Sequence, residues 1–267
     1  MNSYFVGAPT LNRPVSQVCT AAQFAEDDFL RLVATFKQTP RMHRKQWEYA
    51  YTLRVLEVHD MLRAGRNGVG FGVSDEPILA VMAAAGMQLT ATEHPAYRPG
   101  GQVREQLSVM DVFYGGICAE DEFRRRVAFC TVDMNAMPLG LGVFDVVWAC
   151  SVIEELGSIR AGADFVVAAS GLLKRGGIGV FTTQFNARSD SSTIESPRLS
   201  VWRRLDLLDL LDRLVEAGCE MLPLSLTPGN LPEDAIVDTP PYANPVHLKL
   251  TSGDHTLTSV GFAFRKP

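Results

Sequence analysis

The sequence predicts an α/β fold with a mostly parallel sheet and helices on both of its faces. Short, nearly continuous apolar runs at residues 87–92, 127–132, 144–150 and 178–183 are typical of strands buried on both sides. Segments of helical periodicity, such as residues 161–174 and 203–217, separate or follow these runs. Alternating segments at residues 247–250 and 259–264 flank a Ser-Gly-Asp turn and predict a C-terminal antiparallel hairpin.

Composition narrows the class of protein. Hydrophobic residues make up 46% of the 267 residues and charged residues 21%, which is ordinary for a globular protein. The net charge of −5 gives no electrostatic reason to expect nucleic acid as a partner. No apolar run reaches the roughly 20 residues of a membrane span, so no membrane insertion is expected. Five scattered cysteines predict reduced thiols and a cytoplasmic location, and the N-terminal residues do not suggest a signal peptide.

The first 64 residues predict an N-terminal helical extension, followed by a second domain at residues 65–267. After an irregular start, residues 22–37 and 43–63 place apolar side chains at helical spacing among charged ones. Two roles stay open for these helices: packing against the sheet, and forming a lid over a pocket. The triple arginine at residues 124–126 has acidic neighbours and predicts a solvated helix face.

A glycine-rich segment, GRNGVGFGVSDEPILAVMAAAGMQLTATEHP at residues 65–95, predicts a strand, a turn, a helix and a second strand. Gly68, Gly70 and Gly72 alternate with apolar residues, and glycine in such a turn lets a ligand approach the backbone. Ser74 or Asp75 is the expected N-cap of the helix, with proline in its first turn and a glycine stop at residue 86. Glu93 follows the second strand, where a carboxylate accepts hydrogen bonds from ribose hydroxyls.

The spacing of these glycines points away from phosphate-bearing cofactors. The dinucleotide fingerprint requires glycines at its first, third and sixth positions, and the sixth position here is Val73 or Asp75. The segment also lacks the lysine of a Walker loop. S-adenosylmethionine (SAM) carries no phosphate and fits such a turn followed by an acid. A structural strand–turn–helix without any ligand is the alternative.

Several motifs, in order, resemble those of class I SAM-dependent methyltransferases, and in particular a bacterial branch that includes polysaccharide-biosynthesis enzymes. The matching segments are GFGVSDEPI at residues 70–78, Glu93, CTVDMNAMP at 130–138, FDVVWA at 144–149, EELG at 154–157, GGIGVFTTQFN at 176–186, DTPPY at 238–242 and HLKL at 247–250. The resemblance covers roughly residues 65–265. It implies a Rossmann-like sheet.

The resemblance also implies roles for individual residues. The first motif, with Gly70, Phe71, Gly72 and Ser74, would line the methionine end of SAM, and Glu93 would hold the ribose. Asp133 would accept from the adenine amino group, Met134 would pack on the ring, and Ser151 would lie near the transferred methyl. Glu154, Glu155 and Gln184, just past two strands, are the candidate catalytic residues, because methyl transfer to a hydroxyl requires alignment and a base.

The chain departs from the pattern at several positions. Ser74 replaces a glycine, and Gly68 stands where a carboxylate often precedes the first motif. Histidines of the relatives are replaced by Glu155 and Phe181, and a glutamate by Gln184. The cofactor pocket is therefore expected to be kept, while the acceptor chemistry is changed or lost. No His/Cys/Asp cluster has metal-ligand spacing, so no metal is expected.

The resulting prediction is a SAM-dependent methyltransferase acting on a small-molecule or glycan acceptor, at oxygen. The alternative is a SAM- or nucleoside-binding protein without methyltransferase activity, serving as a regulatory or partner subunit. A short dehydrogenase is a weaker third candidate, because the dinucleotide glycines and a Tyr-x-x-x-Lys pair are both missing. The sequence leaves open the acceptor and whether the chain forms an oligomer.

Overall fold

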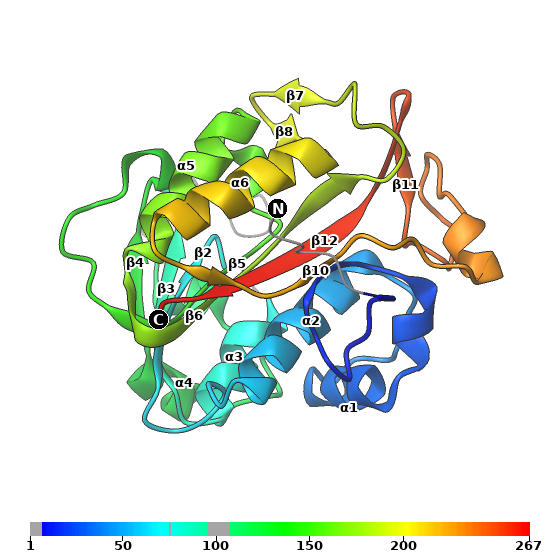
Figure 1. The fold of residues 1–267 in the computed structure, drawn as a ribbon. Coiled ribbons are helices and arrows are strands. Elements are labelled where there is room, and N and C mark those ends of the chain that lie inside the picture. Colours follow the sequence, from blue (N-terminus) through cyan, green and yellow to red (C-terminus); the bar gives the residue numbers. More distant parts are fainter. Residues whose placement is uncertain (1–6, 75, 96–106) are drawn as a thin grey trace.

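The computed structural model describes residues 7–74, 76–95 and 107–267. Its centre is a mixed sheet whose larger part is parallel, in the order β4-β3-β2-β5-β6 (Figure 1). The strands are β2 (Asn67–Phe71), β3 (Gln88–Glu93), β4 (Val127–Thr131), β5 (Phe144–Cys150) and β6 (Leu173–Asn186). The predicted α/β fold with a mostly parallel sheet is confirmed. The order reverses between β2 and β5, and this switch point is where such sheets bind ligands.

The sheet continues past β6 with an antiparallel strand, β12 (His255–Arg265), which pairs with β6 along nine register positions. Together with β11 (Leu250–Ser252), β12 forms the predicted C-terminal hairpin. Beyond it lie β1 (Ser16–Val18), antiparallel to β12, and β10 (Leu224–Ser225), parallel to β1, while β9 (Glu220–Met221) also pairs with β12. The N-terminal segment, predicted to be irregular, therefore contributes a fully buried strand to the sheet.

Helices cover both faces of the sheet, as predicted (Figure 1). One face carries α1 (Asp27–Thr35), α2 (Arg44–Val58), α3 (Pro77–Ala84) and α4 (Glu120–Arg126), and the other carries α5 (Ile159–Ser170) and α6 (Arg204–Glu216). Short 3₁₀ turns are η1 (Ala21–Ala25), η3 (Val109–Val112), η4 (Met134–Ala136), η5 (Ile153–Glu155) and η6 (Pro232–Ala235). A small hairpin joins β7 (Glu195–Ser196) to β8 (Leu199–Ser200). No helix in the described ranges combines the length and apolar character that a membrane crossing requires.

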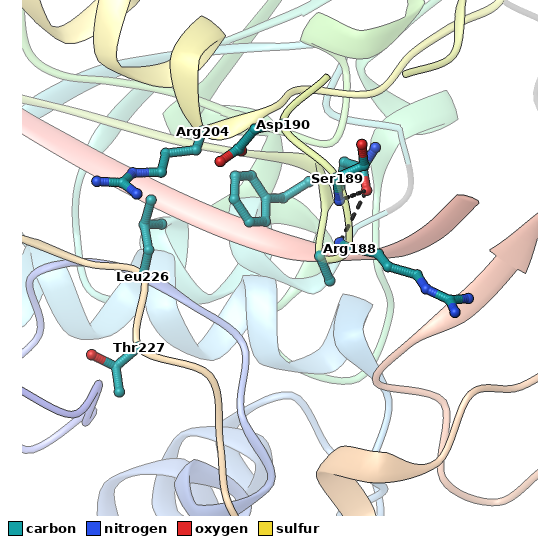
Figure 2. Close-up of a pocket in the computed structure, with 9 residues that line it drawn as sticks. Arg188, Ser189, Asp190, Arg204, Leu226 and Thr227 are labelled. Atoms are coloured by element: carbon teal, nitrogen blue, oxygen red, sulfur yellow. Dashed lines mark hydrogen bonds between the residues drawn. The ribbon is translucent and has the colours of Figure 1, made fainter. Parts of the chain in front are cut away.

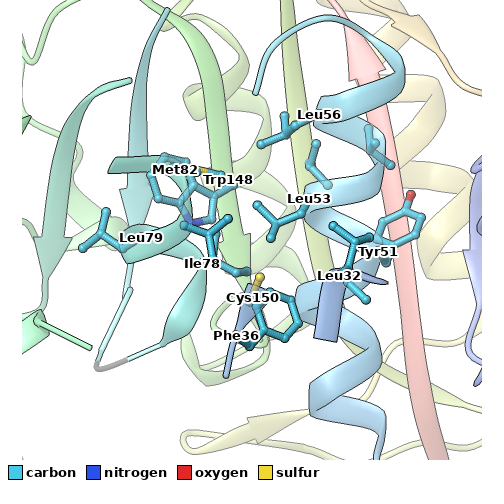
Figure 3. Packing of buried hydrophobic residues seen from close by; sticks show 14 of the residues in the cluster. Leu32, Phe36, Tyr51, Leu53, Leu56, Ile78, Leu79, Met82, Trp148 and Cys150 are labelled. Atoms are coloured by element: carbon cyan, nitrogen blue, oxygen red, sulfur yellow. The ribbon is translucent and has the colours of Figure 1, made fainter. Parts of the chain in front are cut away.

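The core under α1, α2 and α3 is built on β5. Leu53 and Leu56 of α2 and Ile78 of α3 pack with Trp148, whose side chain is 1% exposed (Figure 3). These residues lie on both sides of position 64, so one hydrophobic core joins the N-terminal helices to the glycine-rich unit. The division at residue 64 remains a prediction about the sequence and does not separate two cores.

Trp148 also explains two of the alternating glycines. A Cβ atom at Gly70 would lie 2.3 Å from the Trp148 ring, and one at Gly68 would lie 3.1 Å from it. Real Cβ atoms do not approach other atoms as closely as 2.3 Å, so packing requires glycine at position 70, whereas the contact at Gly68 is only tight. Packing against Trp148 is thus a second reason for glycine inside the strand, and ligand access to the backbone at these positions stays a prediction.

Three local predictions were wrong. The helix expected over residues 161–174 ends at Ser170, because Lys174 belongs to β6 and its Nζ contacts Asp145 of β5 at 3.0 Å. The strand at residues 127–132 was expected to be buried, but β4 is the edge of the sheet and is partly exposed. The N-cap of α3 is Glu76 rather than Ser74; Asp75, the other candidate, lies outside the described residues.

The solvated helix face predicted at α4 is confirmed for Arg124 and Arg125, whereas Arg126 is partly buried and donates to the Gly86 carbonyl at 2.9 Å. Arg124, Arg125 and Arg126 each pair with an acidic residue one helical turn earlier.

Candidate ligand-binding site

A cavity of about 620 Å³ lies at the carboxyl ends of β2, β3 and β5, at the switch point of the sheet. Its walls come from the turns after these strands, from the segment after β4, and from α2. The lining residues are Lys45, Tyr49, Gly72, Ser74, Glu76, Glu93, His94, Asp133, Met134, Asn135, Cys150, Ser151, Val152, Glu155 and Leu156. We distinguish a strand-end wall (Gly72, Ser74, Glu93, Asp133, Met134) from a charged wall (Lys45, Tyr49, Glu76).

The strand-end wall begins with the turn after β2. Gly72 has a φ of +60°, and a Cβ atom there would lie 2.7 Å from Val152. Its N–H donates to the Thr92 carbonyl at 2.9 Å, which ties the turn to β3. Ser74 follows with a φ of +42°, a conformation that side chains rarely adopt. This tight turn brings the backbone N–H of Ser74 onto the carboxylate of Glu93.

Glu93 is the last residue of β3 and is 4% exposed, although it borders the cavity. Burial raises the pKa of Glu93, and hydrogen bonds from the backbone N–H groups of Ser74 and His94 oppose the rise without cancelling it. The nearby carboxylate of Glu155 adds to the rise. The carboxylate of Glu93 is thus held in one orientation by backbone donors.

The segment after β4 supplies the rest of this wall. Asp133 is the N-cap of η4, and its Oδ1 accepts from the Asn135 N–H at 2.9 Å. Met134 is 7% exposed and presents an apolar surface next to this acid. A carboxylate and a buried thioether side by side suit a flat heteroaromatic ring with a polar edge.

The charged wall centres on Lys45, whose side chain is 30% exposed. Its Nζ lies 3.2 Å from Oε2 of Glu48, 3.3 Å from Oε1 of Glu76 and 3.3 Å from the Cys150 carbonyl oxygen. The same nitrogen lies 5.5 Å from the centre of the Tyr49 ring. Burial raises the pKa of Glu76 to about 7, with Lys45 acting against the rise. For Lys45, burial lowers the pKa, but the carboxylates of Glu48 and Glu76 raise it above its ordinary value.

Glu48 of α2 anchors this wall from behind. It is fully buried, and its carboxylate accepts from Arg44 at 3.0 Å, from Ser151 at 2.7 Å and from Thr182 at 3.2 Å. Ser259 of β12 donates to the same carboxylate. Burial alone would raise the pKa of Glu48, but Lys45, Arg44 and these hydroxyls lower it to about 2. The cluster fixes α2 on the carboxyl edge of β5 and β6 and holds Ser151 at its φ of +55°.

The structure brings together most of the residues predicted for the site. Those that line the cavity are Gly72, Ser74, Glu93, Asp133, Met134, Ser151 and Glu155. Four others do not line it: Gly70, Phe71, Glu154 and Gln184. Phe71 is fully buried and packs edge-on against Phe165, at 5.0 Å between ring centres, so its side chain is not available to the cavity.

Glu154 is buried behind the cavity, with 1% exposure. Its Oε2 accepts from the Thr183 hydroxyl at 2.9 Å, whereas Oε1 has no hydrogen-bond partner in the described part of the chain. Burial raises the pKa of Glu154 to about 7, and the charge of Glu48 adds to the rise. Gln184 lies on β6, two residues past Thr182, and is half-buried.

Sequence reasoning missed the charged wall. Glu76 belongs to a matching motif, and an acid at a helix start was an available signal. Lys45 and Tyr49 carried no signal, because α2 buries side chains around most of its circumference and no local pattern marks the side facing the cavity. His94, which directly follows Glu93, also lines the cavity.

A second cavity, of about 390 Å³, lies beyond the end of β6 (Figure 2). Asn186 Oδ1 accepts from the N–H groups of Arg188 and Ser189, both at 3.1 Å, which shapes this loop. The side chains of Arg188 and Arg204 point in opposite directions in Figure 2, so they do not converge on one anion. Across the described ranges, no group of three or more His, Cys, Asp or Glu residues is placed to hold a metal ion.

Comparisons with known proteins identify the fold. No family model matches the chain, and no curated protein matches its sequence. A methyltransferase-like protein from Bacillus halodurans C-125 has a similar structure, with a TM-score of 0.51 and 14% identity over 80% of this chain and 98% of that one. The chain has a class I methyltransferase fold. Looser matches include the N-terminal domain of EvdMO1 with S-adenosylhomocysteine (SAH) and D-fucose (TM-score 0.49, 13% identity, 82% and 83% covered) and the glycopeptide N-methyltransferase MtfA (0.48, 14%, 84% and 90%).

Proposed function

We propose that this protein is a SAM-dependent methyltransferase that acts on a small-molecule or glycan acceptor, at an oxygen atom. The observation that carries the proposal is the position of Glu93. It ends the second strand of a strand–turn–helix–strand unit, borders the cavity and accepts from the backbone N–H of Ser74 in the glycine turn. A carboxylate at this position accepts hydrogen bonds from ribose hydroxyls.

The charges of the cavity support SAM over a phosphate-bearing cofactor. Four carboxyl groups (Glu76, Glu93, Asp133, Glu155) and one lysine ammonium line it. SAM is a net cation at neutral pH, because its sulfonium and ammonium outweigh its carboxylate, whereas a dinucleotide brings two negative phosphates. An acidic cavity attracts the first and repels the second. A volume of about 620 Å³ lies within the range of small-molecule pockets.

In the proposed binding mode, the residues of the strand-end wall contact the adenosine and methionine parts of SAM. Glu93 holds the ribose, Asp133 accepts from the adenine amino group, and Met134 packs on the ring. Gly72 and Ser74, with their left-handed backbone, leave room for the methionine end beside β2. Ser151 lies near the transferred methyl.

When bound, SAM supplies an electrophilic methyl group. The chain must then align an acceptor hydroxyl in line with it and take up the proton. Of the three candidate catalytic residues, Glu155 lines the cavity, so the proposal gives it the role of base. Burial raises the pKa of Glu155, with Lys45 opposing, and a raised pKa makes a carboxylate a stronger base. Glu154 and Gln184 remain candidates that would act from outside the cavity.

Calorimetry with SAM and SAH tests the cofactor. We expect the wild type to bind with a dissociation constant near 1 μM, about −8 kcal/mol, and Glu93→Ala to lose this binding. Asp121→Ala, which removes an exposed carboxylate of α4, is the control and should bind as the wild type does. If the folded wild type binds neither ligand, the proposal fails.

One observation favours a SAM-binding protein without activity as the second candidate. Glu154 and Gln184 do not line the cavity, and the histidines of similar methyltransferases are replaced in this chain. Mass spectrometry of SAH release in the presence of hydroxylated acceptors, including free sugars and nucleotide sugars, separates the two. SAH formed with a methylated product supports the enzyme, and binding without turnover supports the second candidate.

The proposal includes a cytoplasmic location. All five cysteines are free, and four of them are buried. An oxidising compartment favours disulfides, so reduced and dispersed thiols are consistent with a reducing one.

A further inference from the structure

The ammonium of Lys45 is shared between three acceptors rather than committed to one. Its distances to Glu48, Glu76 and the Cys150 carbonyl are 3.2–3.3 Å, at the long end of the range for N–H···O bonds. A lysine ammonium has three donors, and here each has one loosely placed oxygen. These contacts lie on the cavity surface, next to the turn after β5.

The two carboxylates on Lys45 differ in how firmly they are held. Glu48 has no exposed surface and accepts from five side chains, so it cannot turn away. Glu76 lines the cavity, and Lys45 is its one cationic partner among the described residues. The pair of Lys45 and Glu76 therefore presents a positive and a negative group side by side, and a ligand can separate them while Glu48 still neutralises part of the lysine charge.

We infer that Lys45 and Glu76 bind the amino-acid end of SAM, with Lys45 holding its carboxylate and Glu76, together with the Cys150 carbonyl, holding its ammonium. This inference rests on the proposed function. The zwitterionic end of SAM carries one group of each sign, so it replaces one ion pair of the free protein by two and leaves no charge unpaired. The carboxylate missing at Gly68 is thereby supplied by Glu76, from the other side of the glycine turn.

The measurable consequence is a preference of the protein for ligands that carry the amino-acid end of SAM. 5′-Methylthioadenosine has the adenine, ribose and thioether of SAH but lacks the amino acid. Lys45 and Glu76 then contribute to SAH binding and not to methylthioadenosine binding, whereas Glu93 contributes to both. Charge-assisted hydrogen bonds of this kind change affinity by about 10- to 100-fold.

The experiment compares the two ligands by calorimetry on the wild type, Lys45→Met and Glu76→Gln. We expect the wild type to prefer SAH by about 10-fold or more, and each variant to lower the affinity for SAH by a similar factor. The affinity for methylthioadenosine should stay within about 2-fold. Lys45→Arg should retain part of the preference, and Asp121→Ala, which removes an exposed carboxylate of α4 outside the cavity, should leave the ratio unchanged.

The outcomes separate this inference from the proposed function. Equal affinity of the wild type for both ligands, or variants that weaken both ligands equally, overturns the inference while the nucleoside site stands. If neither ligand binds the folded wild type, both fail. Because Lys45→Met leaves Glu48 with one cation fewer, thermal unfolding of each variant is measured first. Glu76→Gln, which keeps the side-chain shape, decides the outcome if Lys45→Met does not fold.

Discussion

The two walls of the cavity are held in different ways. The strand-end wall is positioned within one short stretch of chain: a positive-φ turn at Gly72 and Ser74 places the Ser74 N–H on Glu93, at the end of the adjacent strand. The charged wall depends on a buried carboxylate, Glu48, that contacts residues more than 100 positions away. A wall held by local backbone geometry tolerates substitutions elsewhere in the chain. In a buried ion cluster, removing one charge leaves the other charges without partners and destabilises the whole cluster. Substitutions in each wall test that difference.

The largest expected effect follows from Glu48→Gln. This change leaves Arg44 and Lys45 without their shared buried anion, and losing one partner of a buried ion pair costs about 3–5 kcal/mol. The folded pKa of about 2 lies below the ordinary value of 4.5, so the stabilisation is present above pH 4.5 and is lost as pH falls towards 2. Urea unfolding at pH 7 and pH 3 measures this.

Glu26→Gln is the matched control, since the Glu26 carboxylate accepts from the Thr10 hydroxyl and the Leu11 N–H and has no cationic partner among the described residues. We expect Glu26→Gln to lower the free energy of unfolding by less than Glu48→Gln does, and to leave α2 in place. If Glu48→Gln costs less than about 1 kcal/mol, the cluster is not what holds the charged wall.

The second prediction concerns the support of the strand-end wall. Gly70→Ala places a Cβ atom 2.3 Å from the Trp148 ring, and overpacking of this kind costs about 1–3 kcal/mol. Gly68→Ala, at 3.1 Å from the same ring, should cost less. Thermal unfolding ranks the two. Equal losses would mean that Trp148 moves freely and that the glycines are not set by packing.

The smallest expected effect is a pH dependence from Glu154. Its folded pKa of about 7 is raised above the ordinary 4.5, so the folded state binds more protons than the unfolded one between these values, and stability falls as pH rises through this window. Between pH 5 and pH 8, the free energy of unfolding of the wild type should fall by about 1–2 kcal/mol more than that of Glu154→Gln.

Unfolding of both proteins at the two pH values measures this difference, and Glu155→Gln, at a carboxyl group less buried than Glu154, should follow the wild type more closely. Parallel pH curves for the wild type and Glu154→Gln would show that Glu154 is ionised at pH 5 already, against the burial argument.

Helices and strands that are marked by a pattern of neighbouring residues were predicted correctly. The unit of β2, α3 and β3 followed from glycine alternation, Pro77 and the stop at Gly86, and the hairpin followed from alternation around Gly253. Errors arose where a residue that looked typical of one element makes its main contact with a residue far away in the sequence. Lys174 was included in the helix expected over residues 161–174, but it lies on β6 and pairs with Asp145 on the neighbouring strand.

The sequence alone determined the order of β2, α3, β3, β4, β5, α5 and β6 along the chain and the placement of Glu93 at the end of β3. These features depend on the periodicity of apolar residues and on backbone preferences of glycine and proline, which act between neighbours. The tertiary structure alone decided that Trp148 requires Gly70, and that Lys45, Glu48 and Glu76 meet at the cavity. Glu48 and Ser259 are 211 residues apart, and a buried charge takes its partners from whatever the fold brings near. No pattern of neighbouring residues in the sequence predicts a contact of this kind.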